Sequence, residues 1–182
     1  MNGEEMIDFR LEHIFSYAGS LTGTPAITAS VADGFGVDFC YSGGELAGPR
    51  LRGTLRPGGG DWTIMRVDGV GRLDVCRTLE AHDGVSLAAV YQGVIDIGEE
   101  GVRMLRQGAL PPVAQLRFAL RFVTDHSKYR WLEQLHCFGI GEYRAMDNAV
   151  RYDVYAVHHG RRRAVRSRQD MTSLSDHREC LI

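Results

Sequence analysis

Several carboxyl, imidazole and phenol side chains lie in stretches that alternate like β-strands, where they could transfer protons. In residues 70–80, Leu73 and Val75 share one face of the predicted strand and Asp74 lies on the other. If that second face is exposed to solvent, Asp74 is an ordinary surface residue. If it faces the interior, burial would raise the pKa of its carboxyl, and Asp74 could act as a general acid or base.

Two histidines lie within strongly apolar predicted strands. His13 alternates with Phe15 and Tyr17, which predicts that its imidazole points inward, and His136 alternates with Phe138. Such a histidine is either a hydrogen-bonded core residue or a proton shuttle at neutral pH. We therefore keep His13 with Asp74 as a candidate acid or base.

Other side chains could bind or polarise a ligand. Tyr91 could donate a hydrogen bond to a carbonyl oxygen, and Arg121 could anchor a carboxylate, unless they are core and surface residues. Asp61 either caps the amides of the glycine-rich turn before it or lies in a pocket, and Trp62 is a core, rim or ligand-stacking aromatic. The set of candidate ligand-binding residues comprises Trp62, Asp61, Phe15, Tyr17, Trp131 and His136.

The elements that would position these residues are mostly strands. Period-two alternation predicts strands over 9–17, 37–41, 70–81, 85–95, 115–124, 129–143 and 150–157, with an Asp83-Gly84 turn in a hairpin. Residues 99–107 have helical spacing instead, with Gly108 just beyond. The chain is predicted to be all-β: a single closed antiparallel barrel of about 8–10 strands with one short helix, because closure removes exposed strand edges.

Composition excludes several classes of protein. The 182 residues carry a formal net charge of −2, so no overall field attracts nucleic acid or an anionic membrane. Apolar runs are too short to span a bilayer, and the N-terminus lacks the features of a secretion signal, so a cytoplasmic protein is expected. The four cysteines are widely spaced, which predicts buried free thiols and no zinc site. No nucleotide-binding or metallohydrolase motif is present, so we expect neither cofactor nor metal.

The sequence changes character at residue 160. Residues 1–159 form the predicted barrel, whereas residues 160–182 form an arginine-rich polar extension with five arginines in 161–168. This extension is either a solvated tail or an arm that docks on a second subunit or an acidic partner. A homodimer is compatible with the sequence, but no feature requires it.

A series of short motifs resembles the family known as domain of unknown function 3237. They include Ser42-Gly-Gly-Glu-Leu-Ala-Gly-Pro-Arg-Leu51, Pro57-Gly-Gly-Gly-Asp-Trp62, Tyr91-Gln-Gly93 and Phe138-Gly-Ile-Gly141. The resemblance covers roughly residues 11–157. It implies a small closed barrel, similar in shape to calycins and allene oxide cyclase-like barrels, and no settled activity. The chain departs from the family at Cys76-Arg77, where members usually have an arginine followed by an aromatic residue, and at Glu133.

Three functional hypotheses follow. The first is a cofactor-free isomerase, cyclase or lyase that acts by proton transfer on a small, largely apolar, carbonyl-bearing molecule held in the barrel. Asp74 and His13 would be the acid or base, and Tyr91 or Arg121 would polarise an oxygen. The second is a non-catalytic binder or carrier of such a molecule, and the third is an interaction subunit that uses the C-terminal basic arm.

Overall fold

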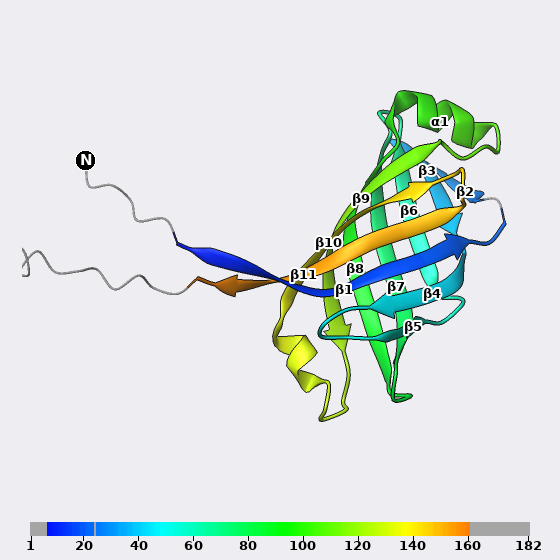
Figure 1. Ribbon diagram of the computed structural model, residues 1–182. Helices are drawn as coiled ribbons and strands as arrows, with labels where there is room; N and C mark the ends of the chain where they lie inside the picture. Colours follow the sequence, from blue (N-terminus) through cyan, green and yellow to red (C-terminus); the bar gives the residue numbers. More distant parts are fainter. Residues whose placement is uncertain (1–6, 24, 161–182) are drawn as a thin grey trace, which may run out of the picture.

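The computed structural model describes residues 7–23 and 25–160 of the chain. These residues form eleven strands, one α-helix and one short 3₁₀ helix (Figure 1). The elements are β1 (Phe9–Leu21), β2 (Ala26–Val31), β3 (Gly34–Phe39), β4 (Tyr41–Ala47), β5 (Gly53–Leu55), β6 (Gly60–Arg66), β7 (Val70–Ala81), β8 (Ser86–Asp96), α1 (Gly98–Arg106), β9 (Val113–Val123), the 3₁₀ helix (Arg130–Gln134), β10 (His136–Arg144) and β11 (Ala149–His159).

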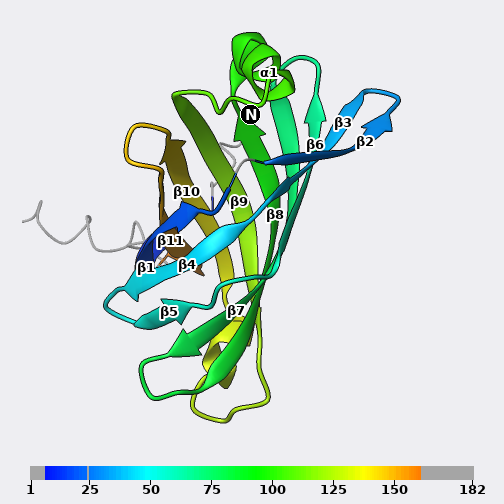
Figure 2. The same ribbon diagram turned by 90° about the vertical axis from the view of Figure 1, so that its right-hand side faces the viewer.

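All strand pairs are antiparallel, and the sheet closes through β7. The strand order is β2-β3-β6-β7-β5-β4-β1-β11-β10-β9-β8, and β8 also pairs with β7. Eight strands, from β7 through β5 and β1 to β8, thus form a closed barrel, and β6, β3 and β2 extend the sheet beyond it (Figure 2). The predicted fold class is confirmed.

The long strand β7 has two different partners along one side. Its first part pairs with β6, from Gly71 to Cys76, and its last part pairs with β5, from Leu79 to Ala81. The chain between β5 and β6 crosses this change of partner, and it contains Gly58 and Gly59 of the glycine run, whose third member, Gly60, begins β6. A glycine-rich segment is suited to this place because its backbone must approach β7 closely.

The core is the barrel interior, and the alternation of β9 shows how the sequence fills it. Leu116, Phe118, Leu120 and Phe122 are buried inside, whereas Arg117 and Arg121 are exposed outside. A half-buried strand requires this pattern, with branched or aromatic side chains on its inner face and charged side chains on the face exposed to solvent.

Helix α1 covers one end of the barrel (Figure 1). Val102 and Leu105 are buried, and Arg106 lies over the ring of Phe35 on β3 with its guanidinium carbon 5.1 Å from the ring centre. Gly108 has a φ of +77°, which ends the helix at the place that the sequence predicts.

Two predicted strands need correction. The segment expected as one strand over 129–143 begins with the 3₁₀ helix Arg130–Gln134, and β10 starts only at His136. In β1 the register with β11 shifts between His13 and Phe15, which is a β-bulge at Ile14. An inserted residue reverses which face the following side chains occupy, so the two halves of β1 do not share one alternation.

The remaining predictions on composition have mixed outcomes. Cys137 is buried, but Cys40 and Cys76 are exposed, so the expectation of buried thiols is wrong for these two. Cys180 and the basic segment 161–182 lie outside the described residues. In the described part of the chain, no helix is both long and apolar enough to cross a bilayer.

Candidate functional site

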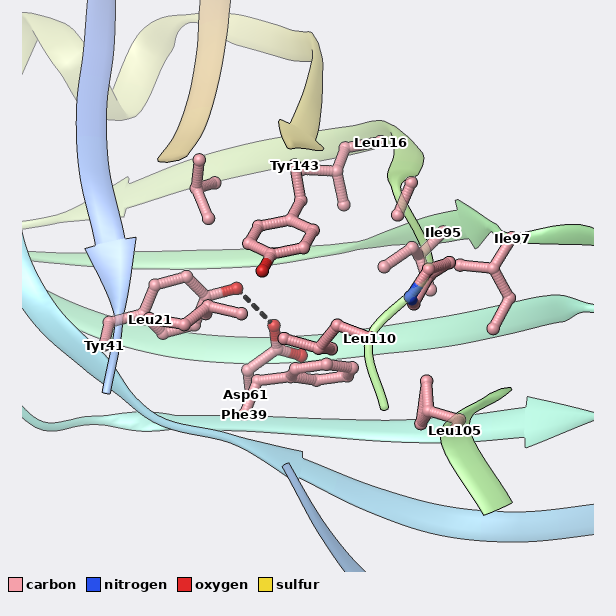
Figure 3. A pocket seen from close by; sticks show the side chains of 13 residues that line it. Leu21, Phe39, Tyr41, Asp61, Ile95, Ile97, Leu105, Leu110, Leu116 and Tyr143 are labelled. Atoms are coloured by element: carbon pink, nitrogen blue, oxygen red, sulfur yellow. Dashed lines mark hydrogen bonds between the residues drawn. The ribbon is translucent and has the colours of Figure 1, made fainter. Parts of the chain in front are cut away.

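A cleft lies at the end of the barrel beneath α1 (Figure 3). Its wall is mostly apolar and comes from eight strands, from α1 and from the loop that follows it. Residues that line it include Leu21, Phe39, Ile95, Leu105, Leu110 and Leu116, with Tyr41, Asp61 and Tyr143 as the polar members.

Asp61 is the one carboxylate among these lining residues, and it is only 3% exposed. The hydroxyl of Tyr41 donates to its Oδ2 at 2.8 Å, and the hydroxyl of Thr63 donates to its Oδ1 at 3.1 Å. Figure 3 shows the Tyr41–Asp61 bond in the cleft, with the hydroxyl of Tyr143 directed to the same region. A buried carboxylate that is fixed by two donors, with spare lone pairs, is suited to accept a proton from a bound molecule.

The alternation of β6 explains why Asp61 points inward. Asp61, Thr63 and Met65 are buried, and Trp62 and Ile64 point outward. A Cβ on Gly60 would lie within 2.0–2.4 Å of the Trp62 ring, so the indole folds back over the glycine on the outer face. Trp62 is therefore not a wall of the cleft.

Burial raises the pKa of Asp61 to about 6. The hydrogen bonds from Tyr41 and Thr63 and the positive charge of Arg77 oppose this rise without cancelling it. The carboxyl thus changes protonation near neutral pH, where an acid–base group is most effective. Burial also raises the pKa of Tyr41 well above its usual value, so its phenol remains a hydrogen-bond donor.

Arg77 stacks on the ring of Tyr41. Its guanidinium carbon is 4.4 Å from the centre of the Tyr41 ring, and the residue is 2% exposed. Its Nη2 donates to the carbonyl oxygen of Arg56 at 3.3 Å, and its Nε is buried with no partner among the described residues.

An aromatic cluster fills the barrel below the cleft. Tyr17 and Tyr152 stack with ring centres 4.6 Å apart, and Tyr91 contacts Phe118 at the same separation. Burial raises the pKa of Tyr17, Tyr91 and Tyr152, and the charge of Arg77 opposes the rise in each case. The cluster is therefore a packed, neutral core with hydroxyl groups near a buried cation.

The predicted acid–base residues do not meet at this cleft. Asp74 is exposed on the outer face of β7, where its Oδ1 accepts a hydrogen bond from Gln92 at 3.3 Å. Of the two orientations that the sequence leaves open, the structure has the solvent-facing one.

His13 also points outward, contrary to the prediction, because the bulge at Ile14 separates it from the alternation of Phe15 and Tyr17. Its side chain is 36% exposed and packs on Tyr155, and its Nε2 lies 3.2 Å from the hydroxyl of Ser16. His13 is thus a surface residue on the β1–β11 ladder.

The other predicted residues divide between wall, core and surface. Arg121 is exposed on β9, and His136 is exposed on β10 rather than set in apolar surroundings. Trp131 is half-buried on the 3₁₀ helix, under the guanidinium of Arg50 at 4.8 Å. Phe15, Tyr17 and Tyr91 are core residues, so Asp61 alone among the predicted residues lines the cleft.

Sequence reasoning missed Tyr41, Thr63 and Arg77 as site residues. The signal for Arg77 was its parity, because it shares the inward face of β7 with Val75 and Leu79. An arginine at an apolar position was the cue that its charge is buried. The pairing of Tyr41 with Asp61 depends on the β3–β6 register, which alternation alone does not give.

The cleft is narrow. It holds about 390 Å³ of unfilled space including its mouth, but only about 20 Å³ of this can take the centre of a water molecule. That is enough for about one water, so a larger molecule requires Leu105, Leu110 or their neighbours to move outward. In residues 7–23 and 25–160, no three His, Cys, Asp or Glu side chains gather as a metal site would require.

Related proteins share this barrel. A UPF0311 protein from Rhodopseudomonas palustris strain CGA009 is 32% identical over 94 residues, which are 50% of this chain and 61% of that protein, so this chain spans less than two thirds of its length. A UPF0311 protein from strain TIE-1 is 31% identical over 117 residues, covering 63% of this chain and 75% of that protein.

Solved structures agree with the fold. A protein of unknown function from R. palustris superposes with a TM-score of 0.72 at 24% identity, over 84% of this chain and all of that one (100%). A β-barrel-like protein from Acinetobacter baumannii gives 0.69 at 25% identity, over 85% and 99% of the two chains. An enzyme from Penicillium herquei gives 0.61 at 22% identity, over 86% and 99%. At such identities these likenesses concern the fold.

The family is established by a separate match. Residues 37–157, from β3 to β11, match the family model for proteins of unknown function DUF3237. The matched region contains Tyr41, Asp61 and Arg77. The chain therefore belongs to the DUF3237 family.

Proposed function

We propose that the protein is a cofactor-independent enzyme of the isomerase, cyclase or lyase kind, with Asp61 as its general base and acid. The observation that carries the proposal is a carboxylate, 3% exposed, that receives a 2.8 Å hydrogen bond from Tyr41 in an otherwise apolar cleft. Asp61 takes the place of Asp74 and His13 in the earlier hypothesis, since both of these lie on the outer surface.

The chemistry that fits this arrangement is proton transfer next to a carbonyl group. The Asp61 carboxylate removes a proton from the carbon beside the carbonyl, and the electron pair of the broken C–H bond moves onto the carbonyl oxygen. The resulting Asp61 carboxylic acid returns the proton to another atom of the substrate. General acid–base catalysis of this type contributes roughly 10²- to 10⁴-fold to a rate.

The polar residues around Asp61 have distinct parts in this step. Tyr41 and Thr63 hold the carboxylate in place through its two oxygens. The hydroxyl of Tyr143, which points into the cleft, is the candidate donor to the oxygen on which charge develops (Figure 3). Side chains such as Phe39 and Leu105 would surround the apolar part of the substrate.

The substrate class follows from the lining. The wall is apolar apart from three polar side chains, so a small, largely apolar molecule with one carbonyl group matches it. The structural neighbour from P. herquei is an enzyme with the same fold. The residues of this cleft, rather than that likeness, support the proposal.

The test is proton exchange into a probe ketone. Wild-type protein and Asp61→Asn are incubated with 2-tetralone in D₂O, and loss of the α-protons is followed by NMR. Wild type should accelerate exchange, with a rate that rises through about pH 6, and Asp61→Asn should lose the acceleration. Asp74→Asn is the matched control and should exchange like wild type. Equal rates for wild type and Asp61→Asn would remove Asp61 from the mechanism.

A second candidate function is non-catalytic binding of the same class of molecule. The narrow, apolar cleft favours it, because such a cavity can hold a ligand without chemistry. Binding of 2-tetralone with no exchange above the protein-free rate would support the carrier.

A further inference from the structure

Arg77 is a buried cation for which the barrel supplies no close anion. It is 2% exposed, and no described carboxylate lies within 4.0 Å of its guanidinium, although Asp61 is near enough for the two charges to interact. Its hydrogen bond from Nη2 to the carbonyl oxygen of Arg56 is long at 3.3 Å, and its other polar neighbour is the neutral phenol of Tyr17. The buried Nε has no partner in that part of the chain. A charge buried in this way is costly unless something pairs with it.

An aromatic ring covers the guanidinium of Arg77. The face of the Tyr41 ring covers the guanidinium at 4.4 Å, which favours a cation but uses none of its N–H groups. Tyr41 also lines the cleft, whereas Arg77 does not, so the Tyr41 ring contacts both the cation and the cleft.

The glycine run also packs against Arg77. Gly59 has a φ of +82°, and a Cβ there would lie 2.8 Å from Cδ of Arg77 and 3.2 Å from its Nε. The backbone of this segment therefore packs directly on the arginine side chain. Next to it, Gly58 has a φ of +87°, and a Cβ there would meet no atom within 4 Å, so this part of the segment is open to the outside.

We infer that Arg77 is an anion anchor: the barrel end binds an organic molecule whose oxygen carries negative charge, as in a carboxylate or an enolate, and that oxygen pairs with the guanidinium. The inference rests on the proposed function in one respect, because it names the charge of the molecule that Asp61 would act on. An arginine fork pairs with two oxygens at once, which suits a carboxylate. Rotation of Tyr41 or displacement of the Gly58–Gly59 segment gives the oxygen access to Nε.

Binding of two matched probes tests the inference. Benzoate and benzamide have the same size and differ in charge, and their affinities are measured by isothermal titration at about pH 5, where benzoate is ionised and Asp61 is mostly neutral. Wild type should bind benzoate at least roughly tenfold more tightly than benzamide, as hydrogen bonds to a charged group predict.

Variants assign that preference to Arg77. Arg77→Met should abolish it, and Arg77→Lys should retain part of it. Arg121→Met removes an exposed arginine from the outer wall and should leave the preference unchanged. If wild type binds benzoate no more tightly than benzamide, or if the preference persists in Arg77→Met, the inference is wrong. If Arg77→Met does not fold, the affinities of wild type and Arg77→Lys for the two probes still test the inference: wild type should prefer benzoate, and Arg77→Lys should keep only part of that preference.

The probe-binding experiment and the proton-exchange experiment can fail independently of each other. An Arg77-dependent preference for benzoate, together with 2-tetralone exchange that does not depend on Asp61, would support the anchor and refute the enzyme. The reverse pair of results would support the enzyme and refute the anchor.

Discussion

Tyr41 Oη donates to Asp61 Oδ2 at 2.8 Å, and this bond joins the first residue of β4, in the closed barrel, to β6 in the extension of the sheet. Asp38 and Trp62 are partners in the β3–β6 ladder, as are Phe39 and Asp61, so the chain that leaves β3 brings Tyr41 next to the carboxylate. The bond makes Tyr41 a positioning group for Asp61.

Replacement of Asp61 should change how stability depends on pH. Its pKa is raised from 3.8 to about 6 in the folded protein, so its neutral form favours folding. That contribution is complete below pH 4 and is lost as pH rises through 6, by roughly 3 kcal/mol for a shift of this size. Urea unfolding of wild type and Asp61→Asn should show the wild type losing stability relative to the variant between pH 4 and 7. A constant difference would contradict the buried, shifted carboxyl.

Removal of the Tyr41 hydroxyl should move the pH profile. Its hydrogen bond lowers the pKa of Asp61, so Tyr41→Phe should raise the midpoint of the exchange reaction by about one pH unit. Tyr143→Phe is the control, since no hydrogen bond joins Tyr143 to Asp61 among the described contacts; it should reduce the rate without moving the midpoint. An unchanged midpoint in Tyr41→Phe would show that the phenol does not influence Asp61.

Shortening a side chain of the helix that covers the cleft should enlarge the cleft. Leu105→Ala removes a buried side chain from the cleft wall, at a cost of about 2–5 kcal/mol in stability, and should bind 2-tetralone more tightly. Val102→Ala lies on the same helix and is buried, but it does not line the cleft. It should lose stability with no gain in affinity, as measured by calorimetry and thermal unfolding. A gain in both variants would point to general loosening instead.

The glycine run offers a matched pair of substitutions. Gly58→Ala and Gly59→Ala both place a Cβ at positive φ, which costs about 1–2 kcal/mol. Gly59→Ala should cost more, because its Cβ would also lie 2.6 Å from the carbonyl oxygen of Cys76 and 2.8 Å from Cδ of Arg77. Urea unfolding of the two variants should therefore differ. Equal losses of unfolding free energy in the two variants would show that Gly59 does not pack closely against β7.

The sequence predicts most of the fold because alternation identifies strands whose two faces differ. β7, β8 and β9 follow that alternation from end to end, and the Asp83-Gly84 turn and the helix before Gly108 carry clear local signals. The 3₁₀ helix Arg130–Gln134 escapes prediction because five residues are too few to show a helical period, and β10 follows it almost directly.

The site is predicted only in part, for two physical reasons. A single inserted residue at Ile14 reverses the face of His13, and no local pattern in β1 indicates a bulge there. Alternation assigns a residue to one of two faces but does not say which face is interior, so Asp74 and Asp61 look equivalent until the sheet closes. Tyr41 reaches Asp61 only through strand pairing.

A direct titration of Asp61 is the sharpest test of its role as the acid–base group of the cleft. The carboxyl carbon shifts of protein labelled with ¹³C-aspartate are followed by NMR against pH, and Asp61→Asn identifies the resonance. We expect an inflection at about pH 6, because this carboxyl is 3% exposed and lies beside Tyr41. An inflection near the ordinary value of 3.8 would contradict it, because a carboxyl that is always ionised near neutral pH cannot serve as both acid and base.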